Sequence, residues 1–384
     1  KEKYEKELKE KFEEIYNKKI MRKLAPLERE RISQAETFKV CITCAIIFFI
    51  AVLVVGLFIK FSESGPALIL TLIGCFVLSI VFMFIAGNIQ KKFCDRIKSQ
   101  LLTDLLFLFG NFSIYKNEII TLKEIKNTGL FPNANTKNDD DRIGGTYKGM
   151  NVFLVETELS QQDESRDIKG RRYSSSVQVF KGLILKTVLN KKYNGRTIIK
   201  QRALNTEDRM KAFKSEAEEE FGSEISQAAA NSPIVNTISN LISAKENSPL
   251  RNIGIINGNL TLNTTGLSEF KPPKGLEEVI LEDSEFNKSY AVFSNDQVEA
   301  RYLITPAFME RLKKIREVFG AYDVHCVFED NYITLFLETG RDFFEVGDIN
   351  TTLCNKKNYE KTFRELVSIF NLIHYFKLDK KLGL

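Results

Sequence analysis

The chain has 384 residues, 43% of them hydrophobic and 27% charged, a balance that argues against a disordered chain and leaves room for two or three structural units. Its formal net charge of +5 is too small to indicate a nucleic-acid partner, and none is expected. Cys41 and Cys44 have C-x-x-C spacing, but they lie in an apolar run and are expected to pack between helices. The other cysteines show no paired spacing, which fits a reducing compartment.

The first predicted element is an amphipathic helix within residues 1–25. Its apolar residues recur at helical spacing among alternating charges: Tyr4, Leu8, Phe12, Ile15, Ile20 and Leu24. Pro26 is expected to end or kink this helix and to begin a second one, so residues 1–38 are assigned to amphipathic helices. The apolar stripe is expected to pack on the helix at roughly Asn88 to Phe109 or on a second copy of the chain.

Two long apolar runs follow, at residues 40–59 and 66–86. Each has about the 20 residues that a helix needs to cross a hydrocarbon core. Neither run has a charge or a polar face, which argues against two buried core helices. Because only Lys60–Gly65 connects them, we predict a transmembrane hairpin over residues 39–87, followed by a connecting helix over 88–110.

Basic residues flank these runs unevenly. The flanks outside the hairpin carry Arg22, Lys23, Arg29, Arg31, Lys39, Lys91, Lys92, Arg96 and Lys98. The connection between the runs carries only Lys60. Because basic loops stay on the cytoplasmic side, we expect both termini in the cytoplasm.

From Asn111 onward the pattern changes to strands and turns. Residues 145–159 alternate apolar and polar side chains as a half-buried strand does. Asn194–Gly195 and Asn257–Gly258 predict two-residue hairpin turns, because both positions tolerate positive φ. A further hairpin is expected around Asp330–Asn331. The predicted fold class is therefore α+β, with helices and an antiparallel sheet in a cytoplasmic domain.

This domain is expected to have two lobes. Residues 111–270 form a sheet-rich lobe with a helical insertion over 205–250. The second helix of this insertion, residues 233–246, lacks the basic polar face of a membrane-surface helix, so it is expected to dock on the sheet. The break KPPKG, residues 271–275, separates it from an α+β C-terminal lobe over 276–384.

Helix capping explains most of a polar run near residue 295. Ser294 and Gln297 have the spacing of a capping box, and Asp296 would lie in the first helical turn, where the helix dipole favours an anion. Thr305, directly before a proline, predicts the start of a second helix. These residues therefore need no catalytic role.

Glu299, Arg301 and Tyr302 are not explained by capping. A carboxylate two residues from a guanidinium is compatible with an acid–base site, yet neither histidine is near in sequence, and His325 and Cys326 should point to opposite faces of a strand. We expect Arg301 to form a buried ion pair. No phosphate loop, nucleophile elbow, dinucleotide fingerprint or metal-ligand spacing occurs, so no catalytic residue, cofactor or metal is assigned, and an enzyme is the less favoured interpretation.

Basic residues gather between positions 166 and 202. This stretch contains one acidic residue, Asp167, and eleven basic residues: Arg166, Lys169, Arg171, Arg172, Lys181, Lys186, Lys191, Lys192, Arg196, Lys200 and Arg202. One interpretation is neutralisation by an acidic segment of the same domain: Glu277, Glu278, Glu282, Asp283, Glu285, Asp296 and Glu299. The other is that Arg171, Arg172, Lys191, Lys192 and Arg196 face anionic lipid or an acidic partner.

Several short segments of the sequence resemble a known protein family. NTGLFP, GTYKG, VFKGLIL, GRTII, SNDQVEARYLITPAFMERL and GRDFFEV resemble the bacterial membrane-anchored family catalogued as domain of unknown function 3137. The resemblance runs from about Phe12 to Val346 and is least between Asn205 and Leu250. It implies a protein of the bacterial inner membrane with a two-span anchor and a cytoplasmic domain. It implies no activity and no catalytic residues.

The favoured function is a membrane-anchored cytoplasmic binding or scaffold protein. Its expected partners are membrane lipids and another membrane or cytoplasmic protein, or a second copy of the chain. One alternative is a lipid-apposed module resembling a pleckstrin-homology barrel. The other is an enzyme with a site around Glu299 and Arg301.

Overall fold

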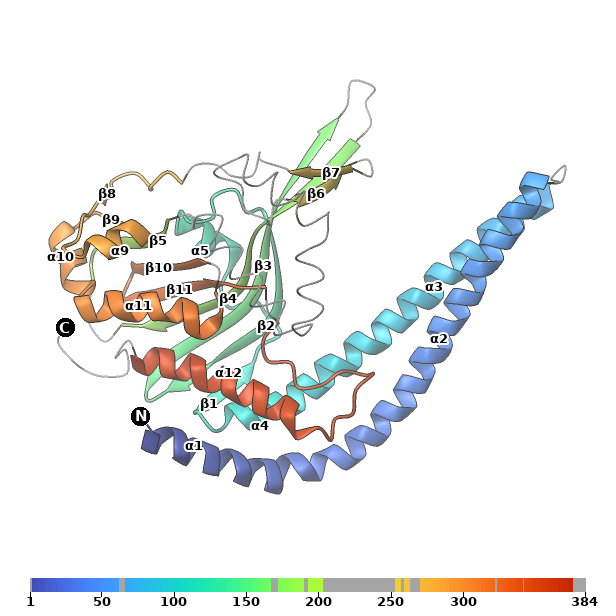
Figure 1. Ribbon diagram of the computed structural model, residues 1–384, viewed down its shortest axis with the longest axis horizontal. Helices are drawn as coiled ribbons and strands as arrows, with labels where there is room; N and C mark the ends of the chain where they lie inside the picture. Colours follow the sequence, from blue (N-terminus) through green and yellow to red (C-terminus); the bar gives the residue numbers. More distant parts are fainter. Residues whose placement is uncertain are drawn as a thin grey trace. The chain divides into compact units, whose positions relative to one another are not determined.

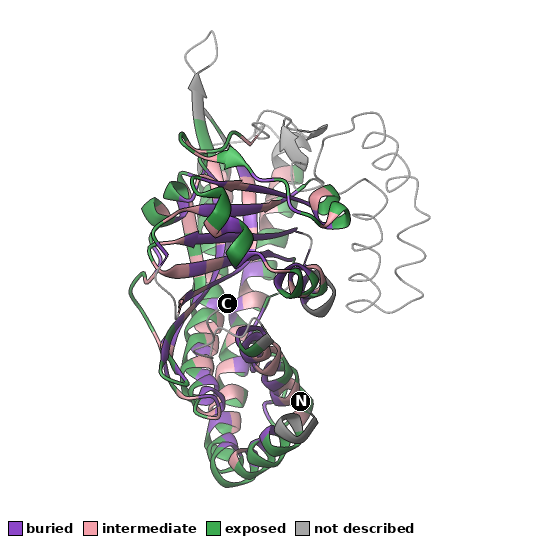
Figure 2. Cartoon of the chain, turned by 90° about the vertical axis from the view of Figure 1, so that its left-hand side faces the viewer, coloured by how far each residue is buried: buried purple, intermediate pink, exposed green. Residues whose placement is uncertain are grey.

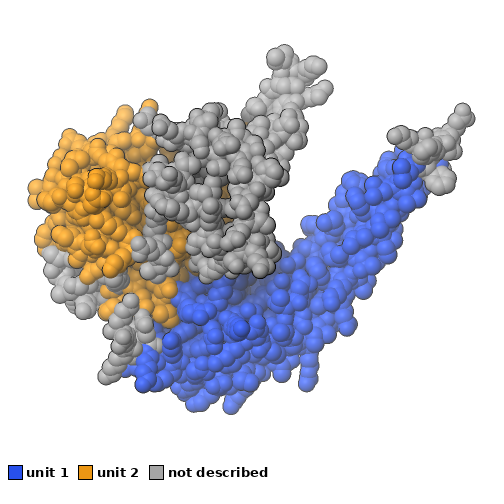
Figure 3. Space-filling model, in the orientation of Figure 1, with its two compact units in different colours: residues 1–109, 344–366 blue, residues 110–343, 367–384 orange. Residues whose placement is uncertain are grey.

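The fold is α+β, as predicted, in a computed structural model of the chain. The structure describes residues 2–61, 66–166, 172–189, 193–202, 253–256, 259–262, 270–321, 323–340 and 342–375. Two compact units are present, one of residues 1–109 with 344–366 and one of residues 110–343 with 367–384 (Figure 3).

Unit 1 is helical. Its elements are α1 (Glu2–Ile15), the π-helical turn η1 (Tyr16–Ile20), α2 (Met21–Phe61), α3 (Pro66–Ile97), a second π-helical turn η2 (Lys98–Leu102), α4 (Thr103–Leu106) and the first half of α12 (Lys356–Tyr375). Pro26 lies inside α2, so of the two expected outcomes, an end or a kink, it does not end the helix. Proline removes the hydrogen bond to the carbonyl of Arg22, but both residues are exposed, so water can satisfy that carbonyl.

The predicted apolar stripe of the first helix is buried in unit 1. Of its predicted members, Leu8, Phe12, Ile20 and Leu24 are buried, whereas Ile15 is only half-buried. Tyr16, which the prediction left out, is buried in its place, so the buried residues recur every four positions. Each such step advances about 40° beyond a full α-helical turn, and the π-helical turn reduces this drift. The ring of Phe12 stacks on Phe363 of α12 with centroids 4.5 Å apart, and α1 also contacts α4, within the region expected as its partner.

Helices α2 and α3 form the predicted hairpin. The Ser79 hydroxyl donates a hydrogen bond to the carbonyl of Ala45 (3.0 Å), and the rings of Phe48 and Phe82 stack with centroids 5.8 Å apart. Cys41 is buried as well, in keeping with a packing role. Both helices are long and apolar enough to cross a membrane, which supports a membrane protein.

Unit 2 is built on a nine-stranded antiparallel sheet (Figure 1). In spatial order its strands are β1 (Asn111–Ile114), β2 (Thr136–Tyr147), β3 (Met150–Arg166), β4 (Arg172–Val188), β11 (Tyr332–Glu338), β10 (Asp323–Glu329), β5 (Thr197–Gln201), β9 (Tyr290–Ser294) and β8 (Glu277–Glu278). A separate hairpin pairs β6 (Ile253–Ile256) with β7 (Asn259–Leu262). Strands from both expected lobes therefore lie in one sheet.

The turn predictions had different outcomes. Asp330 and Asn331 have φ of 52° and 64° and connect β10 to β11, so this hairpin is confirmed. Asn194–Gly195 does not form the predicted hairpin, because β10 and β11 lie between β4 and β5 in the sheet. Asn257–Gly258 and the helical insertion over 205–250 lie outside the described residues, although β6 and β7 do pair.

Helices cover both faces of the sheet. On one face, Ile125 of α5 (Leu122–Asn127) and Phe131, which follows this helix, pack in a cluster with Phe180 and Phe336. On the other, Phe308 of α11 (Pro306–Phe319) packs on Phe328 with centroids 5.6 Å apart. The central strands are consequently buried (Figure 2). Two short helices, α9 (Ser284–Ser289) and α10 (Gln297–Leu303), flank β9.

Candidate functional sites

The polar run near residue 295 forms the start of α10. The carboxylate of Asp296 accepts a hydrogen bond from the backbone N–H of Glu299 (2.9 Å), so Asp296 is the N-cap. The predicted capping box of Ser294 and Gln297 is wrong, because Ser294 remains in β9, where its hydroxyl contacts that of Thr197 (2.8 Å). The helix therefore begins two residues later than the spacing indicated.

The second predicted helix start is confirmed. Helix α11 begins at Pro306, and the hydroxyl of Thr305 accepts a hydrogen bond from the backbone N–H of Phe308 (3.3 Å). Proline supplies the φ of the first helical position without needing a hydrogen-bond acceptor. Capping thus positions α10 directly after β9, the strand next to the edge strand β8, and α11 directly after α10.

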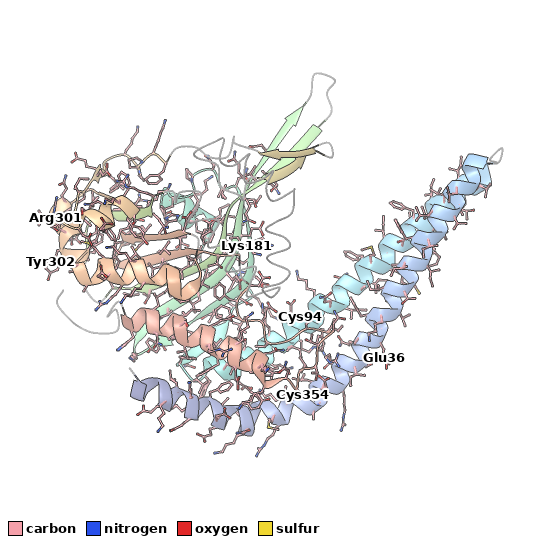
Figure 4. The ribbon with its side chains drawn as sticks, viewed as in Figure 1. Glu36, Cys94, Lys181, Arg301, Tyr302 and Cys354 are labelled. Atoms are coloured by element: carbon pink, nitrogen blue, oxygen red, sulfur yellow. The ribbon has the colours of Figure 1, made fainter. Side chains whose placement is uncertain are left out.

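Arg301 does not form the expected buried ion pair. Its side chain is exposed on α10, and its guanidinium donates to the carbonyls of Gln297 and Ile280, both at 3.2 Å (Figure 4). It faces outward because the buried face of this short helix is taken by Ala300 and Leu303. The arginine therefore links α10 to the segment after β8.

An exposed apolar patch surrounds Arg301. In the described part of unit 2, the large apolar side chains that are most exposed are Tyr115, Ile280, Val298 and Tyr302, and three of these lie at this patch. Val298 and Tyr302 are one helical turn apart, with exposed fractions of 80% and 44%, and Ile280 is 60% exposed. We name Ile280, Val298 and Tyr302 the α10 patch.

The structure describes only part of the basic segment. Arg171, Lys191 and Lys192 lie outside the described residues, as does the side chain of Arg172. Arg196 forms an ion pair with Glu329 (3.3 Å) and donates to the carbonyl of Asn127. Its charge is therefore matched within the domain.

Internal neutralisation is seen for one pair that joins the basic and acidic segments. Arg202 contacts Glu278 at 2.7 Å. Lys181 instead pairs with Asp342 (3.1 Å), and Lys186 pairs with Glu124 (3.2 Å). Four cations of the basic segment thus pair with carboxylates, and three of these carboxylates lie outside the acidic segment expected to supply them.

A buried polar cluster was missed by sequence reasoning. Asp323, His325 and Glu338 are all buried, and their potential ligand atoms lie within 4.8 Å of one another. Asp323 and His325 share a face of β10, and Glu338 lies opposite Asp323 on β11. Only the alternation along β10 was visible in the sequence, because the register that adds Glu338 depends on the hairpin.

The geometry of His325 disfavours a metal centre in this cluster. Its Nδ1 accepts a hydrogen bond from the backbone N–H of Gln201 (3.2 Å), which places the proton of the neutral ring on Nε2. A metal ion needs a free lone pair on a ring nitrogen, so His325 would have to break this bond. The neighbouring Cys326 is also buried, and burial raises the pKa of its thiol well above the usual range.

A second group of carboxylates lies at a β-bulge between β2 and β3. Asp140, Asp141 and Glu156 approach one another there. Both oxygens of Glu156 accept from the backbone N–H of Phe343, at 3.1 and 3.2 Å. Glu156 thus holds the chain segment that follows β11.

Comparison with known proteins places part of the chain in context. Residues 241–378 match the family described as Protein of unknown function (DUF3137). The DUF3137 match includes β9 to β11, α10 and α11, which confirms the resemblance noted around Ser294. It extends beyond the expected end at Val346, and the residues before 241 lie outside it.

No curated protein matches the chain. Among solved structures, the crystal structure of the mycobacterial trehalose monomycolate transport factor A, TtfA, is similar with a TM-score of 0.30 and 9% identity, covering 73% of this chain and 96% of that chain. A TM-score of this size carries no argument about fold or function. The description of the DUF3137 family likewise gives no activity.

Proposed function

We propose that the chain is a membrane-anchored binding protein whose α2–α3 hairpin holds unit 2 at the cytoplasmic face of a bacterial inner membrane. The observation that carries the proposal is the apolar surface of the hairpin. Leu53, Leu57, Leu70, Met83 and Phe84 are each more than half exposed. Soluble monomers rarely expose contiguous apolar surface of this extent, whereas hydrocarbon accommodates it without cost.

The α10 patch is the surface that we assign to a protein partner. Apolar side chains at the centre and charged residues at the rim are typical of transient protein interfaces. Val298 is the most exposed of the three, and Tyr302 adds an aromatic ring, a residue type enriched at binding hot spots. The hairpin would raise the local concentration of the domain near other membrane proteins.

The two alternative functions have less support. An acid–base site at Glu299 and Arg301 would need surroundings that exclude water, whereas the side chain of Arg301 is exposed and its guanidinium donates to two backbone carbonyls. A pleckstrin-homology-like barrel would need the two ends of the sheet to pair. Among the described strands, the sheet has β1 at one end and β8 at the other.

The binding role is tested by changing the patch in the full chain. We expect Val298→Glu to abolish recovery of a single stoichiometric partner after in-cell crosslinking and purification in mild detergent, because a buried unpaired carboxylate destabilises an apolar interface. Quantitative mass spectrometry measures the recovery. Tyr115→Glu is the matched control, since Tyr115 is exposed in unit 2 but lies outside the patch.

Two outcomes would contradict this role. One is equal recovery of the partner with Val298→Glu and with the parent chain. The other is the absence of any stoichiometric partner of the parent. For the first outcome, unchanged thermal unfolding of the variant would show that its domain is intact.

A further inference from the structure

Three lysines lie where the hairpin helices leave the apolar spans. Lys39 directly precedes the first span on α2, and Lys91 and Lys92 follow the second span on α3. All three side chains are exposed. Other cations lie close to them in the sequence, so the ion pairs of each cation decide which of them remain available to bind a ligand.

The helix pairing brings the three lysines to the same end of the hairpin. The Ser79–Ala45 hydrogen bond and the Phe48–Phe82 ring contact set the antiparallel register. Each step toward Lys39 on α2 is therefore matched by a step toward Lys91 on α3. This proximity follows from the packing of the two helices, because Lys39 is more than 50 positions from Lys91 and Lys92 in the sequence.

Their depth corresponds to that of lipid headgroups. Lys91 and Lys92 are five and six residues beyond Ala86, which is about 8 to 9 Å along a helix that rises 1.5 Å per residue. The interfacial layer on each side of the hydrocarbon core is about 5 to 8 Å thick. A long lysine side chain spans the small distance between these positions and the headgroup layer. The same holds for Lys39, which adjoins the first span.

Several cations farther along the helices form ion pairs within unit 1. Arg31 donates to Glu28 at 2.8 Å, Lys23 contacts Asp104 at 2.6 Å, and Arg96 pairs with Glu30. For the three lysines, no carboxylate of the described residues is within ion-pair distance. Even Glu36, the acid one turn from Lys39 (Figure 4), forms no ion pair with it in the described part of the chain.

We propose that Lys39, Lys91 and Lys92 together bind the headgroups of anionic phospholipids in the leaflet that the hairpin enters. The proposal rests on the membrane-anchoring role above. Three unpaired cations at headgroup depth face a surface of opposite charge, and each can contribute an electrostatic attraction that decays within a Debye length. We name these three lysines the lysine collar. Anionic lipids bound there would hold the hairpin at a fixed depth in the membrane.

Spin-labelled lipids test the proposal directly. The full chain is reconstituted in phosphatidylcholine vesicles, and electron paramagnetic resonance measures the motionally restricted fraction of labelled phosphatidylglycerol and of labelled phosphatidylcholine. We expect phosphatidylglycerol to be preferred about twofold to fivefold at low salt. At about 1 M salt, where the Debye length is about 3 Å, the preference should nearly disappear, so that the two lipids are restricted about equally.

Matched variants separate this collar from general charge. The triple variant K39Q/K91Q/K92Q should lose the preference, and K39R/K91R/K92R should keep it. The control K6Q/K9Q/K11Q removes the same charge from exposed positions of α1 and should keep it. If the glutamine variant fails to insert, the arginine variant and the salt dependence of the parent chain still decide the question.

The outcomes distinguish the two proposals. Restricted lipid with no preference for phosphatidylglycerol, or a preference that the glutamine variant retains, overturns the headgroup site while leaving the anchor intact. The absence of any motionally restricted lipid overturns membrane insertion itself, and with it the proposed function.

Discussion

Glu28 connects α2 to the loop before α12, within unit 1. Its carboxylate accepts hydrogen bonds from Arg31 (2.8 Å), from the backbone N–H of Leu353 (2.9 Å) and from the hydroxyl of Thr352 (3.1 Å). Burial opposes ionisation, but these hydrogen bonds outweigh it and lower the pKa of Glu28. A carboxylate with a lowered pKa in the folded state stabilises that state above its unfolded pKa, and this contribution is lost as the pH falls through the folded pKa.

We therefore expect Glu28→Gln to destabilise unit 1 by about 2 kcal/mol at pH 7. The difference from the parent chain should begin to shrink as the pH falls below the unfolded pKa of about 4.3, and it should vanish once the pH has fallen through the lowered folded pKa, where the parent carboxyl is protonated as well. Thermal unfolding in detergent at several pH values measures this. Glu14→Gln is the control, since the Glu14–Lys18 pair is exposed and should contribute nothing measurable. A pH-independent difference would contradict the assigned cause.

At the scale of elements, helix α10 depends on its N-cap. Asp296→Ala should lower the free energy of unfolding of the domain by about 1 kcal/mol, because the N–H of Glu299 loses its acceptor. Asp296→Asn should restore most of the loss. Gln297→Ala should have little effect, whereas the capping box indicated by the sequence would make Gln297 important. Chemical denaturation of the three variants measures the difference, and a larger cost for Gln297→Ala would contradict the structure-based assignment.

At the scale of the whole molecule, the hairpin should leave both termini on one side of the membrane. Basic residues lie in the outer parts of α2 and α3, beyond the two apolar runs, and only Lys60 lies between the runs. We expect a fluorescent protein fused at residue 383 to be active in the cytoplasm and an epitope inserted within 60–65 to be accessible from outside. A C-terminal fusion active only outside the cytoplasm would refute this orientation.

The sequence by itself determined the features that depend on neighbouring residues. The two apolar runs predicted the hairpin because hydrocarbon requires about 20 apolar residues for each helix. Asp330–Asn331 predicted its turn because these residue types tolerate positive φ, and Thr305 predicted the start of α11 through a local hydrogen bond. Such interactions lie within a few residues, so a local pattern is sufficient to reveal them.

The tertiary structure alone decided which distant segments meet. It placed β10 and β11 between β4 and β5, which leaves Asn194–Gly195 outside any hairpin. It brought Glu338 to Asp323 and His325, exposed Arg301 on α10, and set Lys39 near Lys91 at one end of the hairpin. Strand order and helix register arise from pairing and packing between residues far apart in the chain, and local periodicity does not encode these partners.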